Sequence, residues 1–470
     1  MTAATLTLRS PADGTVLGET PITSAAEVHA AARRADEIFR SRVWAGRTPR
    51  ERAAVLSRLA DLMARDAETL ARLDCEDAGK PITECRENDV PSAIESIRWF
   101  AEAVDKQYGT TTASGPDVLA FTEREPFGVV AAILPWNYPL AMAAWKVGPA
   151  LAAGNSLILK PADATPRSVQ HLAALAAEAG LPDGVLQVLP GDGPTTGAAL
   201  ADDPIIGALS FTGSTATGRS ILAAAAASKL KRVSLEMGGK SPQILMDDAV
   251  CLGDELIGGM VESAFLTSGQ NCTAGSRILV HRSIHDEVVA RFAAAADALR
   301  VGHPADPATQ LGPVLTAAAA RRMTDAVAQA LREGATVVTG GGEIDVVPGG
   351  HYVAPTVVTG VTPGSDITRQ ELFGPIVTVQ AFDTRDDAIA LANDIPYGLA
   401  ASVWTTRLDD ALALARGVEA GLVSVGAYSE GDLAMPFGGW KQSGFGGVEK
   451  SLRAFEQWTR EKSVWIRHRP

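Results

Sequence analysis

The residue types around Cys272 point to chemistry on sulfur. A free cysteine is usually a small buried hydrophobic residue, but Cys272 lies among the polar and small residues of segment 270–275, which favours a nucleophile. Glu236 stands in an otherwise apolar stretch and is a candidate general base, the alternative being a surface carboxylate. Asn137 supplies an amide donor in a loop that two flanking prolines make rigid, which suits stabilisation of an oxyanion. Together these residues predict acyl chemistry on the sulfur.

Two further groups of residues suit a nucleotide. Gly213 and Ser214 follow a strand and open a helix, where backbone N–H groups and the positive helix end can bind a phosphate. The alternative is an ordinary serine N-cap after a glycine turn. Lys160 ends another strand and is followed by Asp163, so this pair could bind the two hydroxyls of an adenosine ribose or form a strand-end salt bridge.

The composition is that of a globular protein with excess negative charge. The chain has 470 residues, 46% of them hydrophobic, and a formal net charge of −13. This allows two or three domains and opposes binding to nucleic acid or to an anionic membrane. Residues 1–9 lack the pattern of a signal peptide, and prolines and Lys146 interrupt the apolar stretch 129–159, so we expect no membrane span. Four cysteines without a C-x-x-C pair favour the cytoplasm.

The histidines do not suggest a metal site. Of the seven, only His281 and His285 have ligand-like spacing, and we expect them on a strand end and the following loop. We therefore expect no metal ion. Because no histidine stands beside Cys272 in the sequence, Glu236 is the better candidate base.

The periodicity of apolar residues predicts an α/β protein. Helical spacing extends from residue 25 to about residue 106, and strands then alternate with helices, which predicts a doubly wound parallel sheet with its ligand site at the strand carboxyl ends. A second α/β run after Gly238-Gly239 indicates a second domain. The expected strands cover 129–134, 156–159, 185–189, 204–212, 232–236 and 277–281 and begin near 336, 356 and 376, and the expected helices cover 141–151, 166–179, 215–228, 253–268, 284–299 and 316–332.

Seven motifs, in order, resemble those of the NAD(P)-dependent aldehyde dehydrogenases, from about residue 5 to residue 466. They are Pro135-Trp136-Asn137, Lys160-Pro161, Phe211-Thr212-Gly213-Ser214, Leu235-Glu236 with Gly238-Gly239-Lys240, Gly269-Gln270-Asn271-Cys272, Glu371-Leu372-Phe373-Gly374-Pro375 and Pro436-Phe437-Gly438-Gly439.

The resemblance implies an aldehyde dehydrogenase-like α/β fold, with two doubly wound parallel-sheet domains and a small β oligomerisation arm. Residues 1–106 and 126–238 would form the NAD-binding domain and residues 239–440 the catalytic domain. Residues 107–125 and 455–470 would form the oligomerisation elements of a homodimer or homotetramer.

The resemblance also implies the role of each site residue. Cys272 would be the nucleophile and Glu236 the base that activates water against a thioester, whereas Asn137 and the Cys272 backbone N–H would form the oxyanion hole. The family's cofactor-binding positions fall on Trp136, Lys160, Asp163, Gly213, Ser214, Glu371 and Phe373. We expect NAD rather than NADP, because the Asp163 carboxylate would repel a 2′-phosphate. The base also argues against transfer of the thioester to coenzyme A.

Within the family, the local sequence is most similar to that of bacterial γ-glutamyl-γ-aminobutyraldehyde dehydrogenases. It implies a small aldehyde substrate, an aminoaldehyde or γ-glutamylaminobutyraldehyde of polyamine catabolism. The family's aldehyde tunnel would be lined by Tyr138, Trp145, Glu430, Asp432 and Phe437, whose acids and aromatic rings suit an amine or a polar tail. The alternatives are a semialdehyde or broad aliphatic aldehyde dehydrogenase and a catalytically silent relative kept for binding or structure.

Three positions depart from the family pattern. The chain starts later than the family's usual opening hairpin, so we expect an edge element over the cofactor domain to be missing. Gly426 stands where the family commonly has Asn, and Gly447-Val448 where it commonly has Arg and an acid. These positions would support the active-site wall and the subunit contacts.

Overall fold

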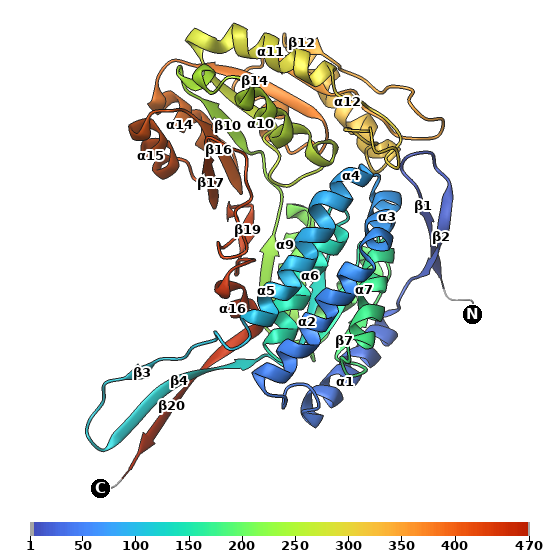
Figure 1. Ribbon diagram of the computed structural model, residues 1–470, viewed down its shortest axis with the longest axis vertical. Helices are drawn as coiled ribbons and strands as arrows, with labels where there is room; N and C mark the ends of the chain where they lie inside the picture. The colour runs from blue at the N-terminus through green and yellow to red at the C-terminus, as the bar shows by residue number, and fades with distance from the viewer. Residues whose placement is uncertain (1–3, 469–470) are drawn as a thin grey trace.

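Two separate β-sheets organise the chain, one in each of two α/β domains (Figure 1). The computed structural model describes residues 4–468. In the first domain five parallel strands lie in the order β9-β8-β5-β6-β7, and the short β19 (Gly444–Phe445) pairs antiparallel with β9. The parallel strands are β5 (Val129–Ile133), β6 (Ser156–Lys160), β7 (Leu186–Val188), β8 (Ala208–Thr212) and β9 (Arg232–Glu236).

The first sheet is covered on both faces, as the doubly wound pattern predicts. Val130 and Ala132 of β5 pack into one hydrophobic core, whereas Val129 and Ala131 pack into another. The first core lies under α2 (Pro49–Arg65), α3 (Ala67–Ala78), α5 (Val90–Glu102), α6 (Pro139–Ala152) and α7 (Arg167–Glu178), and the second under α1 (Ala25–Ser41), α8 (Ala198–Asp202) and α9 (Thr215–Ser228).

Helix starts follow from local sequence. Ser24 and Glu27 form a capping box at the start of α1, and Thr48 and Glu51 form another at the start of α2. Between α3 and α5 the chain forms a short helix α4 (Ile82–Glu84) and one π-helical turn, η1 (Cys85–Asp89). Such turns often occur at functional sites, and this one borders the cavity described below.

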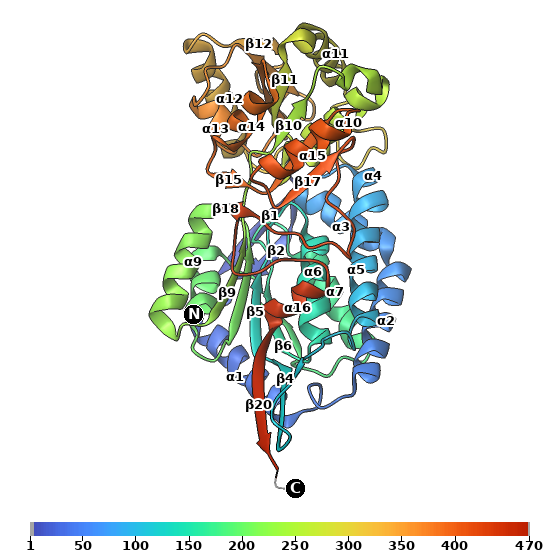
Figure 2. The same ribbon diagram turned by 90° about the vertical axis from the view of Figure 1, so that its left-hand side faces the viewer.

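The second domain holds a seven-stranded sheet in the order β12-β13-β14-β11-β10-β16-β17. This domain lies above the first domain in Figure 2. All pairs are parallel except β12 with β13, so the expected parallel sheet carries one antiparallel edge strand. The strands are β10 (Pro242–Leu245), β11 (Arg277–His281), β12 (Thr336–Thr339), β13 (Thr356–Thr359), β14 (Ile376–Phe382), β16 (Ala400–Trp404) and β17 (Leu422–Val425). The flanking helices are α10 (Asp254–Phe265), α11 (His285–Asp297), α12 (Ala317–Arg332), α14 (Arg385–Asn393) and α15 (Leu408–Gly417).

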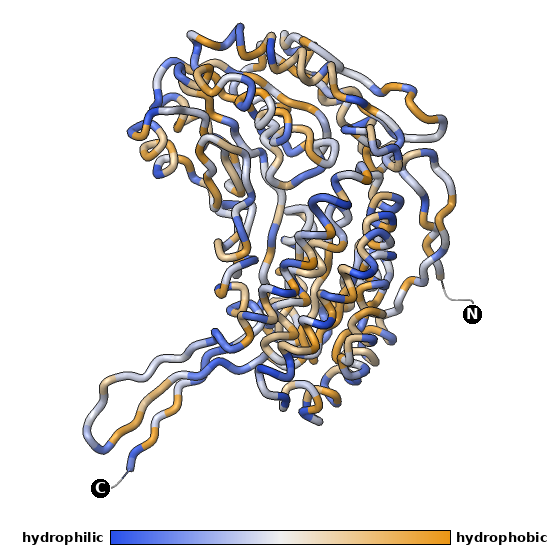
Figure 3. The backbone as a smooth tube through the Cα atoms, viewed as in Figure 1, coloured by the Kyte–Doolittle hydropathy of each residue, from blue (hydrophilic) through white to orange (hydrophobic). Residues whose placement is uncertain are grey.

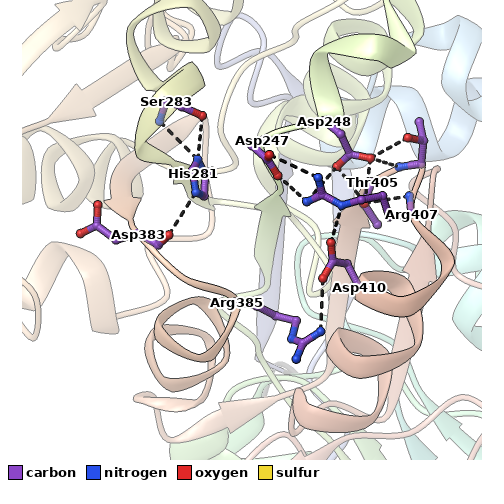
Figure 4. A network of polar contacts seen from close by, with 10 residues as sticks. Asp247, Asp248, His281, Ser283, Asp383, Arg385, Thr405, Arg407 and Asp410 are labelled. Carbon is purple, nitrogen blue, oxygen red and sulfur yellow. Dashed lines mark hydrogen bonds and ion pairs between the residues drawn. The ribbon is translucent and has the colours of Figure 1, made fainter.

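An ion-pair network fastens the carboxyl end of β10 to the start of α15 (Figure 4). Arg407 pairs with Asp247 and, at 2.6 Å, with Asp410, whereas Asp248 accepts hydrogen bonds from Thr405 and Thr406. The charge of Arg407 and these hydrogen bonds lower the pKa values of both aspartates. The network supports the second domain at the end of its sheet opposite the active site.

A three-stranded arm projects from the body of the molecule (Figures 1 and 3). It consists of β3 (Thr111–Thr112), β4 (Val118–Pro126) and β20 (Thr459–Arg467). Trp465 is 68% exposed on β20, and Leu119 and Ile466 are exposed beside it. Large exposed apolar side chains on such an arm are typical of a surface that another chain covers.

The expected absence of an opening hairpin is wrong. Strands β1 (Thr5–Arg9) and β2 (Val16–Pro21) form an antiparallel hairpin, and Gly14 adopts the positive φ of 75° that its turn requires. The turn contacts the second domain, where the Tyr352 hydroxyl donates a hydrogen bond of 3.2 Å to the Ala12 carbonyl.

Residues 4–468 lack two kinds of feature. No helix in this range is long and apolar enough to cross a membrane. No group of three or more His, Cys, Asp or Glu side chains in the same range is arranged to hold a metal ion.

Candidate active site

A cavity of about 830 Å³ lies at the junction of the two domains. The first domain contributes residues that follow β5, β6, β8 and β9, so the carboxyl ends of these parallel strands form one wall, as the sequence predicts. The second domain contributes residues at the amino ends of its parallel strands. Cys272 precedes β11, Glu371 and Phe373 precede β14, and Leu399 precedes β16, so the amino edge of one sheet faces the carboxyl edge of the other.

The cavity brings together all but one of the residues singled out in the sequence. Its lining includes Asn137, Glu236, Cys272, Trp136, Lys160, Asp163, Gly213, Ser214, Glu371, Phe373, Tyr138, Trp145, Glu430 and Phe437. Asp432 is not part of this lining. Its side chain is exposed, and its carboxylate accepts hydrogen bonds of 2.8 and 3.2 Å from the N–H groups of Ala434 and Met435. Asp432 therefore holds a turn, and its expected place in the tunnel is corrected.

Cys272 is half-buried and packs near Trp145, Leu399 and Phe437. Burial, followed by the charges of Glu430, Glu371 and Glu236, raises the pKa of its thiol well above the usual value. The segment does not begin a helix, so the helix dipole that could favour a thiolate is absent from this loop. Neither the burial, nor the surrounding carboxylates, nor the geometry of this loop therefore favours ionisation of the thiol.

Asn137 lies in the loop after β5 and is only 5% exposed. Its Nδ2 donates a hydrogen bond of 2.8 Å to the Gln270 carbonyl, so the amide reaches the nucleophile loop and keeps its second N–H. The backbone carbonyl of Asn137 accepts a hydrogen bond of 3.0 Å from Nζ of Lys80. Lys80 is buried, pairs with Asp89 at 2.5 Å, and its Nζ lies 3.5 Å from the ring centre of Tyr138.

Glu236 ends β9 and is 5% exposed. Burial and the neighbouring charge of Glu449 raise the pKa of its carboxyl well above the usual range, whereas Lys146 and a backbone hydrogen bond from Gly439 oppose this shift. Lys146 and Glu449 form a fully buried ion pair. A raised carboxyl pKa beside a buried ion pair suits a group that exchanges a proton during the reaction.

Lys160 and Asp163 lie at one end of the cavity, at the carboxyl end of β6. Lys160 is buried and donates a hydrogen bond of 3.0 Å to the Pro161 carbonyl. Burial lowers its pKa, while the charges of Asp163 and Asp192 oppose this effect. Of these two carboxylates, that of Asp163 lines the cavity.

Ser214 is an N-cap, as the alternative interpretation of the Gly213-Ser214 motif predicts. The start of the helix can still bind a phosphate. Ser214 is the N-cap of α9 and accepts a hydrogen bond of 3.3 Å from the Thr217 N–H. The Gly213 N–H donates to the Glu236 carbonyl at 3.0 Å, so it joins β8 to β9 and is not free for an anion. Any phosphate at this helix must therefore bind the N–H groups after Ser214.

Glu371 and Phe373 form the opposite side of this part of the cavity. The Gly239 N–H donates a hydrogen bond of 2.9 Å to Glu371, and a Cβ at Gly238 would lie 1.9 Å from the same carboxylate. Burial raises the pKa of Glu371 to about 7. Phe373 has the positive φ of 57°, rare for an aromatic residue, and its ring meets that of Trp136 edge to face at 5.3 Å.

Acidic and aromatic side chains surround the remainder of the cavity. Glu430 accepts a hydrogen bond of 2.7 Å from Oγ1 of Thr273. Glu84 accepts hydrogen bonds from Thr267, and burial raises the pKa of its carboxyl to about 7. Asp89 lines the same region. Of these acids, only Glu430 was singled out from the sequence.

Lys450 lies behind the aromatic wall. Its Nζ is 4.6 Å from the ring centre of Trp145 and 5.4 Å from that of Phe437, and it donates a hydrogen bond of 2.9 Å to the Glu430 carbonyl. Burial lowers its pKa. Lys450 thus fixes both the aromatic wall and the loop that carries Glu430.

Gly426 and Val448, two of the positions that depart from the family pattern, have surroundings that the structure defines. Gly426 has the positive φ of 71° just after β17, a conformation that Asn also tolerates. A Cβ at Gly438 would lie 2.8 Å from Cγ1 of Val448 and 3.3 Å from a carboxylate oxygen of Glu236. Val448 therefore packs on the loop that covers the candidate base.

Comparison with known proteins agrees with this arrangement. The sequence profile of the aldehyde dehydrogenase family matches residues 2–464. The chain belongs to this family. The predicted family, fold class and enzyme class are therefore confirmed.

Relatives of this aldehyde dehydrogenase include two curated bacterial proteins. The aminoacetaldehyde dehydrogenase of Pseudomonas aeruginosa is 45% identical over 457 residues, which cover 97% of this chain and 91% of the relative. The NADP/NAD-dependent aldehyde dehydrogenase PuuC of Escherichia coli is 44% identical over 432 residues, which cover 91% and 86%.

Solved structures of relatives superpose closely on the enzyme. The γ-glutamyl-γ-aminobutyraldehyde dehydrogenase of Burkholderia cenocepacia has a TM-score of 0.96 and 45% identity, with 99% of this chain and 94% of that chain covered. An indole-3-acetaldehyde dehydrogenase solved with NAD+ has a TM-score of 0.96 and 43% identity, with 98% and 93% covered.

Proposed function

We propose that the enzyme oxidises an aminoaldehyde to its carboxylic acid with NAD, through a thiohemiacetal and a thioester on Cys272. The observation that carries this proposal is the single cavity in which Cys272, Asn137 and Glu236 meet the residues suited to a dinucleotide. The acids of the tunnel and the names of the relatives support the substrate class.

Cys272 and Asn137 perform the addition step. The Cys272 thiol loses its proton to solvent, the resulting thiolate adds to the aldehyde carbon, and the carbonyl oxygen becomes an alkoxide. The second N–H of Asn137 and the Cys272 backbone N–H donate to this oxygen, because the first Asn137 N–H is already directed to the Gln270 carbonyl. Loss of hydride from the adduct then leaves a thioester on Cys272.

Glu236 performs the hydrolysis step. It accepts a proton from water, and the water oxygen attacks the thioester carbon. The C–S bond then breaks, which releases the acid and returns the sulfur of Cys272 as a thiolate. The buried Lys146–Glu449 ion pair lies beside Glu236, so Glu236 changes its charge next to a fixed pair of opposite charges. A base that activates water for hydrolysis argues against transfer of the acyl group from the thioester to coenzyme A.

The described residues fit NAD. Lys160 and Asp163 would bind the adenosine ribose, the start of α9 the pyrophosphate, and Glu371 with Phe373 the nicotinamide ribose and ring. Bound NAD would supply the hydride acceptor. Asp163 lines the cavity beside Lys160, so a 2′-phosphate would meet its carboxylate, which favours NAD over NADP.

The tunnel residues suit a substrate that carries an ammonium group. Glu430, Glu84 and Asp89 place carboxylates along the cavity. The rings of Tyr138 and Trp145 line it as well, and the ammonium groups of Lys80 and Lys450 already lie against them. Within residues 4–468 no hydrogen bond engages Oε2 of Glu430, and a purely aliphatic aldehyde would leave this oxygen without a donor. We propose aminoaldehydes of polyamine catabolism, including γ-glutamylaminobutyraldehyde, as substrates.

We also propose a homodimer or homotetramer, built through the exposed apolar side chains of the arm. All four cysteines are free, which supports the cytoplasm as the working compartment.

The function is tested by NADH formation with a panel of aldehydes, with NAD and NADP in parallel. The panel comprises γ-glutamylaminobutyraldehyde, 4-aminobutyraldehyde, aminoacetaldehyde, betaine aldehyde, succinate semialdehyde and hexanal. Higher kcat/KM for the amine-bearing aldehydes with NAD supports the proposal. A preference for succinate semialdehyde or hexanal would refute the substrate class, and no turnover of any member would favour a catalytically silent protein.

A further inference from the structure

Glu430 is hydrogen-bonded to both neighbours of the nucleophile. Oγ1 of Thr273 donates at 2.7 Å and Nδ2 of Asn271 at 3.3 Å, and the Tyr428 hydroxyl donates at 3.3 Å. All three donors converge on one oxygen, Oε1. Within residues 4–468 no hydrogen bond engages the other oxygen, Oε2, and the residue lines the cavity.

This arrangement fixes a negative charge beside the thiol. Cys272 is faced by three carboxylates, from the end of β9 (Glu236), from the loop before β14 (Glu371) and from the loop after β17 (Glu430). The Tyr428 hydroxyl lies on the same loop as Glu430.

The nearby cation does not cancel this charge fully. The ammonium of Lys450 donates to the backbone carbonyls of Glu430 and Gly431, and it lies against the Trp145 and Phe437 rings. Its hydrogen bonds therefore go to carbonyls and not to the Glu430 carboxylate. Of the three carboxylates around the thiol, Glu236 is assigned to water activation and Glu371 to the cofactor. Glu430 is the one on the tunnel side.

We propose that the ammonium group of the substrate activates its own nucleophile through Glu430. An ammonium bound at Oε2 neutralises the carboxylate that is held beside Cys272, and the thiol then ionises more readily. The S–H bond breaks, the electron pair stays on sulfur and the proton leaves to solvent, so no redox change occurs. A neutral aldehyde of the same length cannot do this, so Glu430 selects substrates by reactivity as well as by binding.

This inference rests on the proposed function, because it assumes a substrate with an amine. Glu430 is a positioning residue that responds to the substrate ammonium, since the reacting atoms belong to Cys272 and the aldehyde. A purely structural role for Glu430 would alter folding or KM without moving the pH profile of the thiol.

The test is the rate of alkylation of Cys272 by iodoacetamide as a function of pH. The full-length enzyme is sampled over time, and the peptide that contains Cys272 is quantified by mass spectrometry. Cys251 is exposed and provides an internal reference for reagent and folding. The rate is measured alone, with the unreactive amine 4-amino-1-butanol, and with the neutral 1,4-butanediol.

We expect the amine, and not the diol, to raise the alkylation rate of Cys272 about tenfold near neutral pH, which corresponds to a thiol pKa lower by about one unit. Glu430→Gln alone should give a rise of about the same size and should abolish the response to the amine. Glu262→Gln is the matched control, because Glu262 lines the same cavity but is not one of the three carboxylates that raise the thiol pKa. It should behave as the wild type.

An unchanged pH profile in Glu430→Gln, with normal Cys251 reactivity, would overturn the inference. So would an amine effect that persists in that variant. The ligand-free shift in Glu430→Gln needs no substrate, so it stays informative if aminoaldehydes prove to be poor substrates. A failure of the substrate panel with a positive ligand-free shift would refute the proposed substrate and keep the control of the thiol by Glu430.

Discussion

Lys80→Met tests how the oxyanion donor is held. Lys80 is buried and contacts the Asp89 carboxylate, the Asn137 carbonyl and the Tyr138 ring. Burial lowers the pKa of Lys80, but the charges of Asp89 and Glu84 raise it more, so the ammonium is charged. Methionine keeps the length and removes the charge. It leaves the Asp89 carboxylate buried without a partner.

The substitution affects both the free energy of unfolding and kcat, and the two effects differ in size and in the second substitution that would reverse them. A buried charge without its partner costs about 3–5 kcal/mol of the free energy of unfolding. Loss of an oxyanion donor costs roughly 10²–10³ in kcat, and Lys80→Met displaces Asn137 without removing it, so we expect about a tenfold to hundredfold loss. Adding Asp89→Asn should restore most of the stability. It should not restore kcat, because the contact with the Asn137 carbonyl is still missing.

The assay pairs urea unfolding with NADH formation at saturating aldehyde. Lys106→Met is the matched control, since Lys106 forms an exposed ion pair with Asp105 and should leave the stability nearly unchanged. Equal stability of Lys80→Met and Lys80→Met/Asp89→Asn would refute the buried-charge argument. Wild-type kcat in Lys80→Met would refute the role of Lys80 in holding Asn137.

Three further changes test other parts of the account. Glu236→Gln should slow thioester hydrolysis about 10²-fold or more and leave the first turnover fast, so NADH should form in a burst that stopped-flow absorbance detects. Asp163→Ser should raise kcat/KM with NADP relative to NAD by about tenfold, whereas an unchanged ratio would contradict the repulsion argument. Arg407→Ala should lower the free energy of unfolding by about 1 kcal/mol near pH 7. Because Asp247 and Asp248 have lowered pKa values in the folded protein, their contribution is present above the unfolded pKa of about 3.9 and is lost as the pH falls through the folded values, so urea titrations of wild type and variant should converge in acid.

The sequence placed the strand-end residues correctly because local signals determine them. Glu236, Lys160 and Gly213 each stand at or just after the end of a short apolar run, and parallel strands bring their carboxyl ends to one edge. The helix over 215–228 and the strand over 277–281 agree with the structure residue by residue. Local periodicity and capping suffice for such elements.

The second domain shows where this reasoning fails. The strand-end rule predicts ligands at carboxyl ends, but Cys272 and Glu371 precede their strands. Which edge of a sheet faces a neighbouring domain depends on how the domains dock, and periodicity does not contain that information. The tunnel shows the same limit. Glu430 and Asp432 are near neighbours in one loop, and only the loop conformation turns the first into the cavity and the second outward.

The buried charges of Lys146 and Glu449, which lie beside the candidate base, were not predicted, because their pairing also depends on the fold. Lys146 entered the sequence argument only as an interruption of an apolar stretch, although a charge inside a wholly buried helix needs a partner. Its partner, Glu449, lies 303 residues away in the chain. The isolated charge could have been recognised from the sequence, whereas the identity of its partner required the fold.

The covalent intermediate on Cys272 is the most direct test of the account. Glu236→Gln enzyme would be mixed with NAD and aminoacetaldehyde, quenched in acid within the burst, and analysed by mass spectrometry of the intact protein and of the peptide that contains Cys272. The account predicts a mass increase equal to the acyl group of the substrate, located on Cys272 and absent from Cys272→Ala, which should still bind NAD. NADH formation without this adduct, or turnover by Cys272→Ala, would contradict it.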